Sequence, residues 1–275
     1  MRRSPRTTRS HSSASSSVLR REKYSDISRK PLHILIFLLP LLLLYEIGSF
    51  IYLSRHAGAH VETIKAYRIL MDLFSTFGAD SIKMFHLPGV ALIVVLLCWH
   101  VFSRDGWEIR PAVVGLMWIE AAFLTIPLLV LSQLIARLGM SAPSLAETGS
   151  LISQLTWQQK LTISIGAGIY EELLFRMLII GLLLILLTDV FRAKQWFGYG
   201  LAVLISAILF TLYHQPVQHG VVIWPDVVLY MVSGVFFGYL FLLRGFGIVV
   251  AVHAIYDIAV LLILPLLVTG KSPFS

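Results

Sequence analysis

Six ionisable residues lie in the apolar C-terminal part of the chain, where charged groups are costly. They are Glu171, Glu172, Arg176, His214, His253 and Asp257. An ionisable side chain at the centre of a bilayer costs roughly 2.5–3.5 kcal/mol on insertion scales. Residues of this kind are therefore candidates for mutual pairing or for chemistry. The set contains carboxylates and imidazoles, the groups that most often act as general bases.

The spacing of these residues indicates which of them share a helix face. Glu172 precedes Arg176 by four positions, the order that favours an ion pair within one helix. His253 and Asp257 are also four apart. Glu171 points about 100° away from its neighbour, so it can face a different partner. A carboxylate can act as a base toward water, and two imidazoles can share that water and polarise a carbonyl group.

The composition places these residues in a membrane. Hydrophobic residues make up 57% of the 275 positions, charged residues make up 13%, and the mean hydropathy is +0.82. A soluble domain carries roughly 25% charged residues, which is more than this chain has for a water-facing surface. We therefore predict an all-α, polytopic bundle of transmembrane helices.

Seven segments are apolar over about 20 residues, the length that spans a bilayer. The predicted spans are Pro31–Leu53, Phe85–Phe102, Pro111–Ile135, Gln159–Leu187, Trp196–Tyr213, Asp226–Leu243 and Gly247–Leu267.

Two connecting segments have features of their own. Apolar residues recur at helical spacing near 62–80, which predicts a helix on the membrane surface; a solvent-exposed loop is the alternative. The helix that carries His214 is predicted to end in mid-membrane. Gln215–Trp224 would then be a non-helical stretch that lines a cavity.

The N-terminal 30 residues form a basic tail that is rich in Ser, Thr and Arg. This composition cannot bury enough apolar surface to fold, so residues 1–30 are predicted to be disordered. The tail holds nine Lys and Arg, the connectors on its side of the membrane hold five more, and those on the other side hold seven. This asymmetry predicts a cytoplasmic N-terminus, with membrane lipid rather than nucleic acid as the partner of the tail.

Three short motifs in the C-terminal spans are similar to those of a known family. Glu171–Arg176 carries a Glu pair followed four positions later by Arg, Phe210–His214 carries Phe and then His, and His253–Asp257 carries His and then Asp. Their types and order resemble the CAAX protease and bacteriocin-processing (CPBP) family of intramembrane proteases, which includes the type II CAAX prenyl proteases. The resemblance covers roughly residues 159–268. It implies a catalytic membrane core there, preceded by N-terminal spans and connectors over residues 31–158.

The resemblance also implies a role for each residue. Glu171 matches the base that activates water, and His214 matches its partner. His253 and Asp257 match the positions that stabilise the oxyanion, and the Glu172–Arg176 pair would support them. Asp257 departs from the prenyl proteases, which carry Asn there; an ionised Asp cannot donate a hydrogen bond, so it would act protonated or would orient His253.

The implied function is hydrolysis of a peptide bond near the C-terminus or in the membrane-proximal part of a protein substrate. Such a substrate would be membrane-associated or lipid-modified. A prenylated CAAX protein, a bacteriocin leader and a membrane-anchored sorting tail all fit.

Two other readings of the same residues stay open. In the first, the protease is metal-dependent, and the ligands come from Glu171, Glu172, His214, His253 and Asp257. Zinc suits Glu and His ligands, although the chain has no His-Glu-x-x-His pair. In the second, the chain is a non-catalytic scaffold or a transporter. We expect no cofactor.

Two further acids lie within predicted spans but in no motif. Glu46 and Glu120 are expected to be protonated and to form hydrogen bonds between helices. The chain has one cysteine, Cys98, which excludes an internal disulfide and a cysteine-based zinc cluster.

Overall fold

The computed structural model describes residues 23–53, 64–76, 87–137, 155–215, 217–218 and 221–269. Its α-helices are α1 (Tyr24–Ile27), α2 (Pro31–Gly48), α3 (Lys65–Thr76), α4 (Leu87–Ser103), α5 (Pro111–Arg137), α7 (Trp157–Glu172), α8 (Gly181–Leu184), α9 (Gln195–Tyr213), α10 (Trp224–Arg244), α11 (Phe246–Ile258) and α12 (Leu264–Thr269). Four π-helical segments continue some of them: η1 (Ser49–Leu53), η3 (Leu173–Ile180), η4 (Ile185–Val190) and η5 (Ala259–Ile263). The strands β1 (Val217–Gln218) and β2 (Val221–Val222) form a short antiparallel ribbon.

The predicted all-α membrane bundle is confirmed. Over the described residues, six helices are long and apolar enough to cross a membrane, and α4 is a shorter apolar helix of 17 residues. The longest helix runs from Trp157 to Val190 through α7, η3, α8 and η4. These seven helices correspond one to one to the predicted spans.

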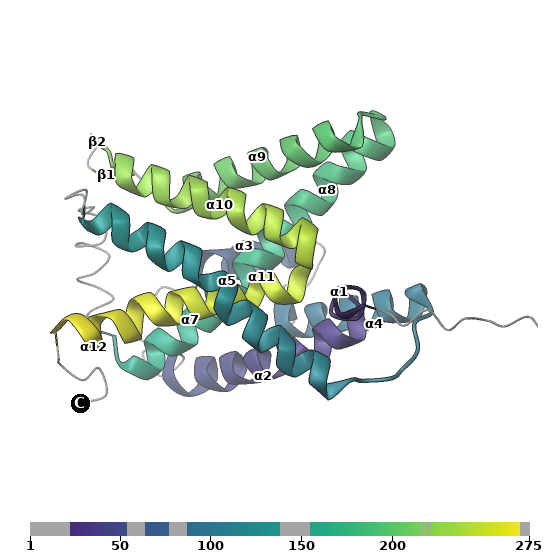
Figure 1. The fold of residues 1–275 in the computed structure, drawn as a ribbon, viewed down its shortest axis with the longest axis horizontal. Coiled ribbons are helices and arrows are strands. Elements are labelled where there is room, and N and C mark those ends of the chain that lie inside the picture. Colours follow the sequence, from purple (N-terminus) through teal and green to yellow (C-terminus); the bar gives the residue numbers. More distant parts are fainter. Residues whose placement is uncertain are drawn as a thin grey trace, which may run out of the picture.

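Close approach between helices depends on small residues. A methyl group added at Gly168 of α7 would lie 2.8 Å from the backbone nitrogen of Ala254 in α11. One added at Gly234 of α10 would lie 2.9 Å from the Cα atom of Ala207 in α9. Glycine thus allows the backbones of α7 and α11, and of α9 and α10, to come together. Figure 1 shows α9 and α10 side by side, joined at one end by the β1–β2 ribbon.

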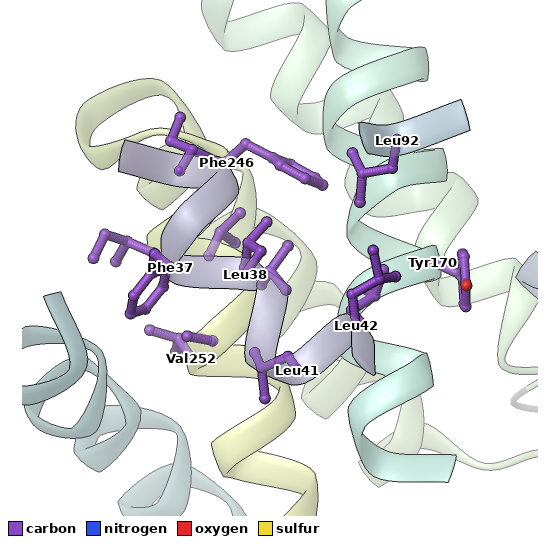
Figure 2. Close-up of a cluster of buried hydrophobic side chains, with 14 of the residues drawn as sticks. Phe37, Leu38, Leu41, Leu42, Leu92, Tyr170, Phe246 and Val252 are labelled. Atoms are coloured by element: carbon purple, nitrogen blue, oxygen red, sulfur yellow. The ribbon is translucent and has the colours of Figure 1, made fainter. Parts of the chain in front are cut away.

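The apolar core joins the N-terminal spans to the C-terminal ones. Side chains of α2 meet α4, α7 and α11 in one buried cluster (Figure 2). Its members include Phe37, Leu38, Leu41 and Leu42 from α2, Leu92 from α4, Tyr170 from α7, and Phe246 and Val252 from α11. The division between residues 31–158 and 159–268 stays a prediction, because α2 packs directly against α7 and α11.

The helix predicted near 62–80 is present as α3. Ala66 and Leu70 are buried on one face, whereas Ile69 and Leu73 are exposed on the other. Its placement on the membrane surface stays a prediction.

The predicted non-helical connector after His214 is found over its described residues. Gln215 has a positive φ of 49°, and the β1–β2 ribbon follows it. α9 has 19 residues, which is about 28 Å of helix. A helix of that length can cross the hydrocarbon core of a bilayer, which is about 30 Å thick. The end of α9 in mid-membrane stays a prediction.

The prediction of a disordered tail is wrong for residues 23–30; residues 1–22 lie outside the described part. Tyr24 and Ile27 of α1 pack against the bundle, and the Tyr24 hydroxyl donates to Glu120 of α5 at 2.6 Å. Burial and the neighbouring carboxylate raise the pKa of Tyr24, so its hydroxyl keeps the proton that it donates.

Both acids outside the motifs form bonds between helices, as predicted. Glu46 accepts a hydrogen bond from the hydroxyl of Tyr170 at 3.1 Å. Glu120 contacts Arg244 Nε and accepts from Nη2 at 2.7 Å. This two-point contact with a guanidinium group is typical of an ionised carboxylate, so the protonated form expected for Glu120 is wrong.

Candidate active site

Three helix ends and junctions position the six residues. Glu171 and Glu172 lie at the end of α7, where the π-helical segment η3 begins. His214 caps the C-terminus of α9. His253 and Asp257 lie on α11, just before the π-helical segment η5. Such π-helical turns often occur at functional sites, because they change the direction of side chains along a helix.

The structure brings all six residues together. The Glu171 carboxylate is buried, and its two oxygens have different surroundings. Oε1 accepts a hydrogen bond from the Tyr213 hydroxyl at 3.2 Å. Oε2 faces Nε2 of His214 at 3.6 Å and Nε2 of His253 at 3.9 Å. Both separations are too long for a direct hydrogen bond. They suit side chains that are each hydrogen-bonded to the same third group, such as a water molecule.

Hydrogen bonding determines which nitrogen of His214 carries a proton. Nδ1 lies 2.8 Å from the carbonyl oxygen of Phe210, which can only accept. Nδ1 is therefore the donor, and Nε2 of the neutral ring is an acceptor. The ring stacks on Tyr230 with centroids 4.2 Å apart, which fixes the direction of Nε2. Nε2 and the Glu171 carboxylate thus present two acceptors to each other across 3.6 Å.

His253 is surrounded by carboxylates. Its Nδ1 donates to Oε1 of Glu172 at 2.7 Å, because an ionised carboxylate can only accept. Its Nε2 lies 3.6 Å from Oδ2 of Asp257 and 3.9 Å from Oε2 of Glu171. The ring stacks on Phe237 with centroids 4.8 Å apart. The helical spacing of four therefore does bring His253 and Asp257 together, but Glu172 holds the other nitrogen.

The Glu172–Arg176 ion pair predicted from spacing is present. Arg176 Nε lies 3.1 Å from Glu172 Oε2, and both side chains are fully buried. The guanidinium carbon lies 4.5 Å from the ring centroid of Phe210 and 5.2 Å from that of Phe237. Aromatic faces attract a desolvated cation, so these rings help to hold Arg176 in the interior.

Four of the six residues line one pocket of about 280 Å³. Glu171, His214, His253 and Asp257 form its polar end, whereas Glu172 and Arg176 lie behind it. The rest of the wall is mostly apolar or aromatic and comes from Ile163, Ala167, Phe210, Leu229, Tyr230, Ser233, Phe237, Tyr256, Val260 and Leu261. The lining residues come from α7, α9, α10, α11 and η5.

The arrangement of the site side chains is relevant to the alternative of a metal-dependent protease. Within the part of the chain that the structure describes, no group of three His, Cys, Asp or Glu side chains is arranged to hold a metal ion. His253 Nδ1 is engaged by Glu172, and His214 Nδ1 by Phe210. Of the four ring nitrogens of these two histidines, only the two Nε2 atoms face the pocket.

Sequence reasoning missed three aromatic residues of the site: Tyr213, Tyr230 and Phe237. Tyr230 and Phe237 each stack on a histidine, and Tyr213 bonds to Glu171. Phe237 lies seven positions after Tyr230, which places both on one face of α10. That spacing alone does not distinguish a stacking role from ordinary packing in an apolar span.

The comparison with known families agrees with the geometry. Residues 153–259 match the family described as type II CAAX prenyl endopeptidase, Rce1-like. Over these residues the chain is similar to the CAAX protease family. The matched range contains all six site residues and overlaps the core predicted at 159–268. No curated protein and no solved structure matches the chain.

This similarity supports, in general terms, an endopeptidase that acts within the membrane. The apolar helices agree with an integral, multi-pass membrane protease.

Proposed function

We propose that this CAAX-family protease cleaves its substrate with a water molecule activated by Glu171 and His214. The observation that carries the proposal is the pair of acceptors, Glu171 Oε2 and His214 Nε2, which lie 3.6 Å apart in the wall of the pocket. A water molecule placed there donates one hydrogen to each acceptor. Its oxygen lone pairs then point into the pocket, toward an incoming carbonyl carbon.

In this mechanism a proton passes from the water to Glu171 as the water oxygen bonds to the carbonyl carbon of the substrate. The electron pair of the carbonyl moves onto its oxygen, which becomes an oxyanion. Collapse of the intermediate breaks the carbon–nitrogen bond, and the proton held by Glu171 passes to the leaving nitrogen. A general base of this kind contributes about 10²–10⁴-fold to the rate.

His253 is suited to stabilise the oxyanion as an imidazolium. Because Nδ1 donates to Glu172, a second proton on Nε2 is needed for donation into the pocket. Three carboxylates, those of Glu171, Glu172 and Asp257, lie around the ring and favour that charge. Asp257 acts here by orienting and charging His253. This role explains how an acid can occupy a position where the prenyl proteases carry an amide.

The substrate is proposed to be a membrane-associated protein, cleaved near its C-terminus or in its membrane-proximal part. Leu229, Val260 and Leu261 give the pocket an apolar wall beside the polar end. This wall suits aliphatic side chains next to the scissile bond, as in the C-terminal segment of a prenylated CAAX protein. A lipid-modified substrate would approach from within the bilayer.

Glu171→Gln tests the proposal, because the amide keeps the size of the side chain but cannot take the proton. We expect cleavage of a prenylated CAAX peptide by the purified protein to fall at least 100-fold, with unchanged thermal stability in detergent. Glu46→Gln is the matched control, since it alters an intramembrane carboxylate outside the pocket. This variant should retain wild-type cleavage.

Other outcomes favour the other readings. Loss of wild-type cleavage on chelation, with recovery on added zinc, would favour a metal-dependent protease. Glu171→Gln cleaving at close to the wild-type rate would contradict the role of the base. If the wild-type protein shows no cleavage and a Glu171→Gln strain keeps the wild-type cellular phenotype, the non-catalytic reading is favoured.

A further inference from the structure

Tyr213 connects the candidate base to a helix outside the matched family core. Its hydroxyl lies between two partners: the backbone N–H of Ala66, at 2.8 Å, and Oε1 of Glu171, at 3.2 Å. Ala66 belongs to the first turn of α3, which precedes the matched residues 153–259. Two hydrogen bonds in series thus connect α3, through one side chain of α9, to a carboxylate of α7.

The two bonds have fixed directions. A backbone N–H can only donate, so the Tyr213 oxygen accepts from Ala66. The hydroxyl hydrogen is then available for Glu171, whose ionised carboxylate can only accept. The amide also lies in the first turn of α3, where the partial positive charge of a helix is concentrated. The Tyr213 hydroxyl is therefore both oriented and polarised as a donor.

The bond determines which oxygen of Glu171 serves the reaction. Oε1 is held by Tyr213, and this leaves Oε2 toward His214 and His253. Among the described residues, no other group makes a hydrogen bond to the carboxylate of Glu171 within 3.5 Å. Without the Tyr213 hydroxyl, the carboxylate is free to rotate about its terminal torsion, which is a broad one.

Tyr213 itself is held firmly by packing. Its ring meets Phe175 edge-on, with centroids 5.2 Å apart, and also contacts the ring of His214. Tyr213 is not among the residues that line the pocket, so its hydroxyl acts on Glu171 without contacting a substrate bound there.

Several contacts keep α3 in register with Tyr213. Lys65 Nζ donates to Oε1 of Gln215, two residues beyond Tyr213, at 3.1 Å. Tyr67 packs against Tyr170, with ring centroids 5.2 Å apart. Burial and the nearby Glu46 carboxylate raise the pKa of Tyr67 to about 12, so this buried contact stays uncharged.

We propose that Tyr213 is a positioning residue of the protease, and that docking of α3 holds the catalytic carboxylate through it. The proposal rests on the role of Glu171 as base. It assigns a catalytic function to a segment, residues 65–76, that lies outside the family motifs. It also makes the activity sensitive to how α3 packs, because displacing this helix removes the Ala66 amide from the Tyr213 oxygen.

Tyr213→Phe tests the first part of the proposal, because it removes the hydroxyl and keeps the ring. A hydrogen bond to a charged group supports a loss of about 10- to 100-fold in kcat. KM should stay unchanged, since the hydroxyl does not face the substrate. Tyr239→Phe, at an exposed position of α10, is the matched control and should leave both constants at the wild-type values. A merely structural role would lower thermal stability and leave kcat per folded molecule intact.

Lys65→Met tests the coupling to α3. This change should lower kcat in the wild-type background but have no further effect in the Tyr213→Phe background, because both act through one hydroxyl. Asp72→Asn is the control, because it removes an exposed charge from the same helix and should leave kcat at the wild-type value. If Tyr213→Phe does not fold, unchanged kcat in Lys65→Met alone overturns the proposal, and a lowered kcat supports it.

The outcomes separate this inference from the proposed function. If Glu171→Gln abolishes cleavage while Tyr213→Phe keeps wild-type kcat, only the positioning role is wrong. If the effects of Lys65→Met and Tyr213→Phe on kcat are additive, α3 does not act through Tyr213, and that part of the proposal is wrong. If Glu171→Gln cleaves normally, the proposed base is wrong, and the positioning role falls with it.

Discussion

Replacing Arg176 with Met should lower the free energy of unfolding by more than the loss of packing contacts alone would. Arg176 and Glu172 are both fully buried and lie 3.1 Å apart. Removing one partner of a buried ion pair costs about 3–5 kcal/mol, because the other charge is left uncompensated. Met keeps most of the apolar volume between Phe210 and Phe237, so the cavity contribution is small.

One contact moderates this cost. Glu172 keeps its hydrogen bond to His253 at 2.7 Å, so a positive neighbour remains beside the stranded carboxylate. We therefore expect a loss near the lower end of the range, about 3 kcal/mol. That is a change of about 150-fold in the ratio of folded to unfolded protein, since 1.4 kcal/mol is tenfold.

The assay is unfolding of the purified protein in mixed micelles by increasing mole fractions of a denaturing detergent, together with protein abundance in membranes. The double change Glu172→Gln with Arg176→Met is the informative control. It removes both charges, and replacing a whole buried pair is often neutral for stability. The double variant should regain most of the lost stability but remain poorly active, because His253 has lost its ionised partner.

Two results would refute this reasoning. Arg176→Met as stable as the wild type would mean that the buried carboxylate does not depend on the guanidinium. A double variant no more stable than Arg176→Met would mean that the loss comes from packing among the aromatic rings, and not from a stranded charge.

Two further predictions concern the acid of the third motif and the orientation of the chain. Asp257→Asn removes one of the three carboxylates around His253 but restores the amide of the prenyl proteases, so it should keep at least a tenth of wild-type kcat; complete loss would show that the negative charge is needed. In a background without the single cysteine, labelling of cysteines introduced at Ser10, Arg192 and Thr269 should place the first two on one side of the membrane and the third on the other. Ser10 and Thr269 on one side would mean an even number of spans.

The spans and the grouping of the ionisable residues could be predicted because both depend on one-dimensional rules. A bilayer requires about 20 apolar residues per crossing, and a spacing of four places two side chains on one helix face. The Glu172–Arg176 and His253–Asp257 pairs follow directly from that spacing. The approach of Glu171 to His214 came from motif order, and the structure places these two side chains in one pocket.

The features that could not be predicted from the sequence depend on contacts between segments far apart in the chain. The bond between Ala66 and Tyr213 joins residues 147 positions apart, and the bond between Tyr24 and Glu120 joins residues 96 apart. Neither leaves a periodic pattern or a recognisable spacing. The basic composition of the tail gave no sign of the contacts that Tyr24 and Ile27 make with the bundle.

The charges of the site explain why two adjacent glutamates are needed. In the proposed mechanism, Arg176 and protonated His253 carry two positive charges, while Glu171, Glu172 and Asp257 carry three negative ones. When the water transfers a proton to Glu171, that carboxylate becomes neutral and a negative charge appears on the oxyanion beside His253. The total charge of the buried site therefore does not change; it moves by a few ångströms. Glu172 cannot take part in this transfer, because Arg176 and His253 hold both of its oxygens, and this fixed charge keeps His253 ready to receive the oxyanion.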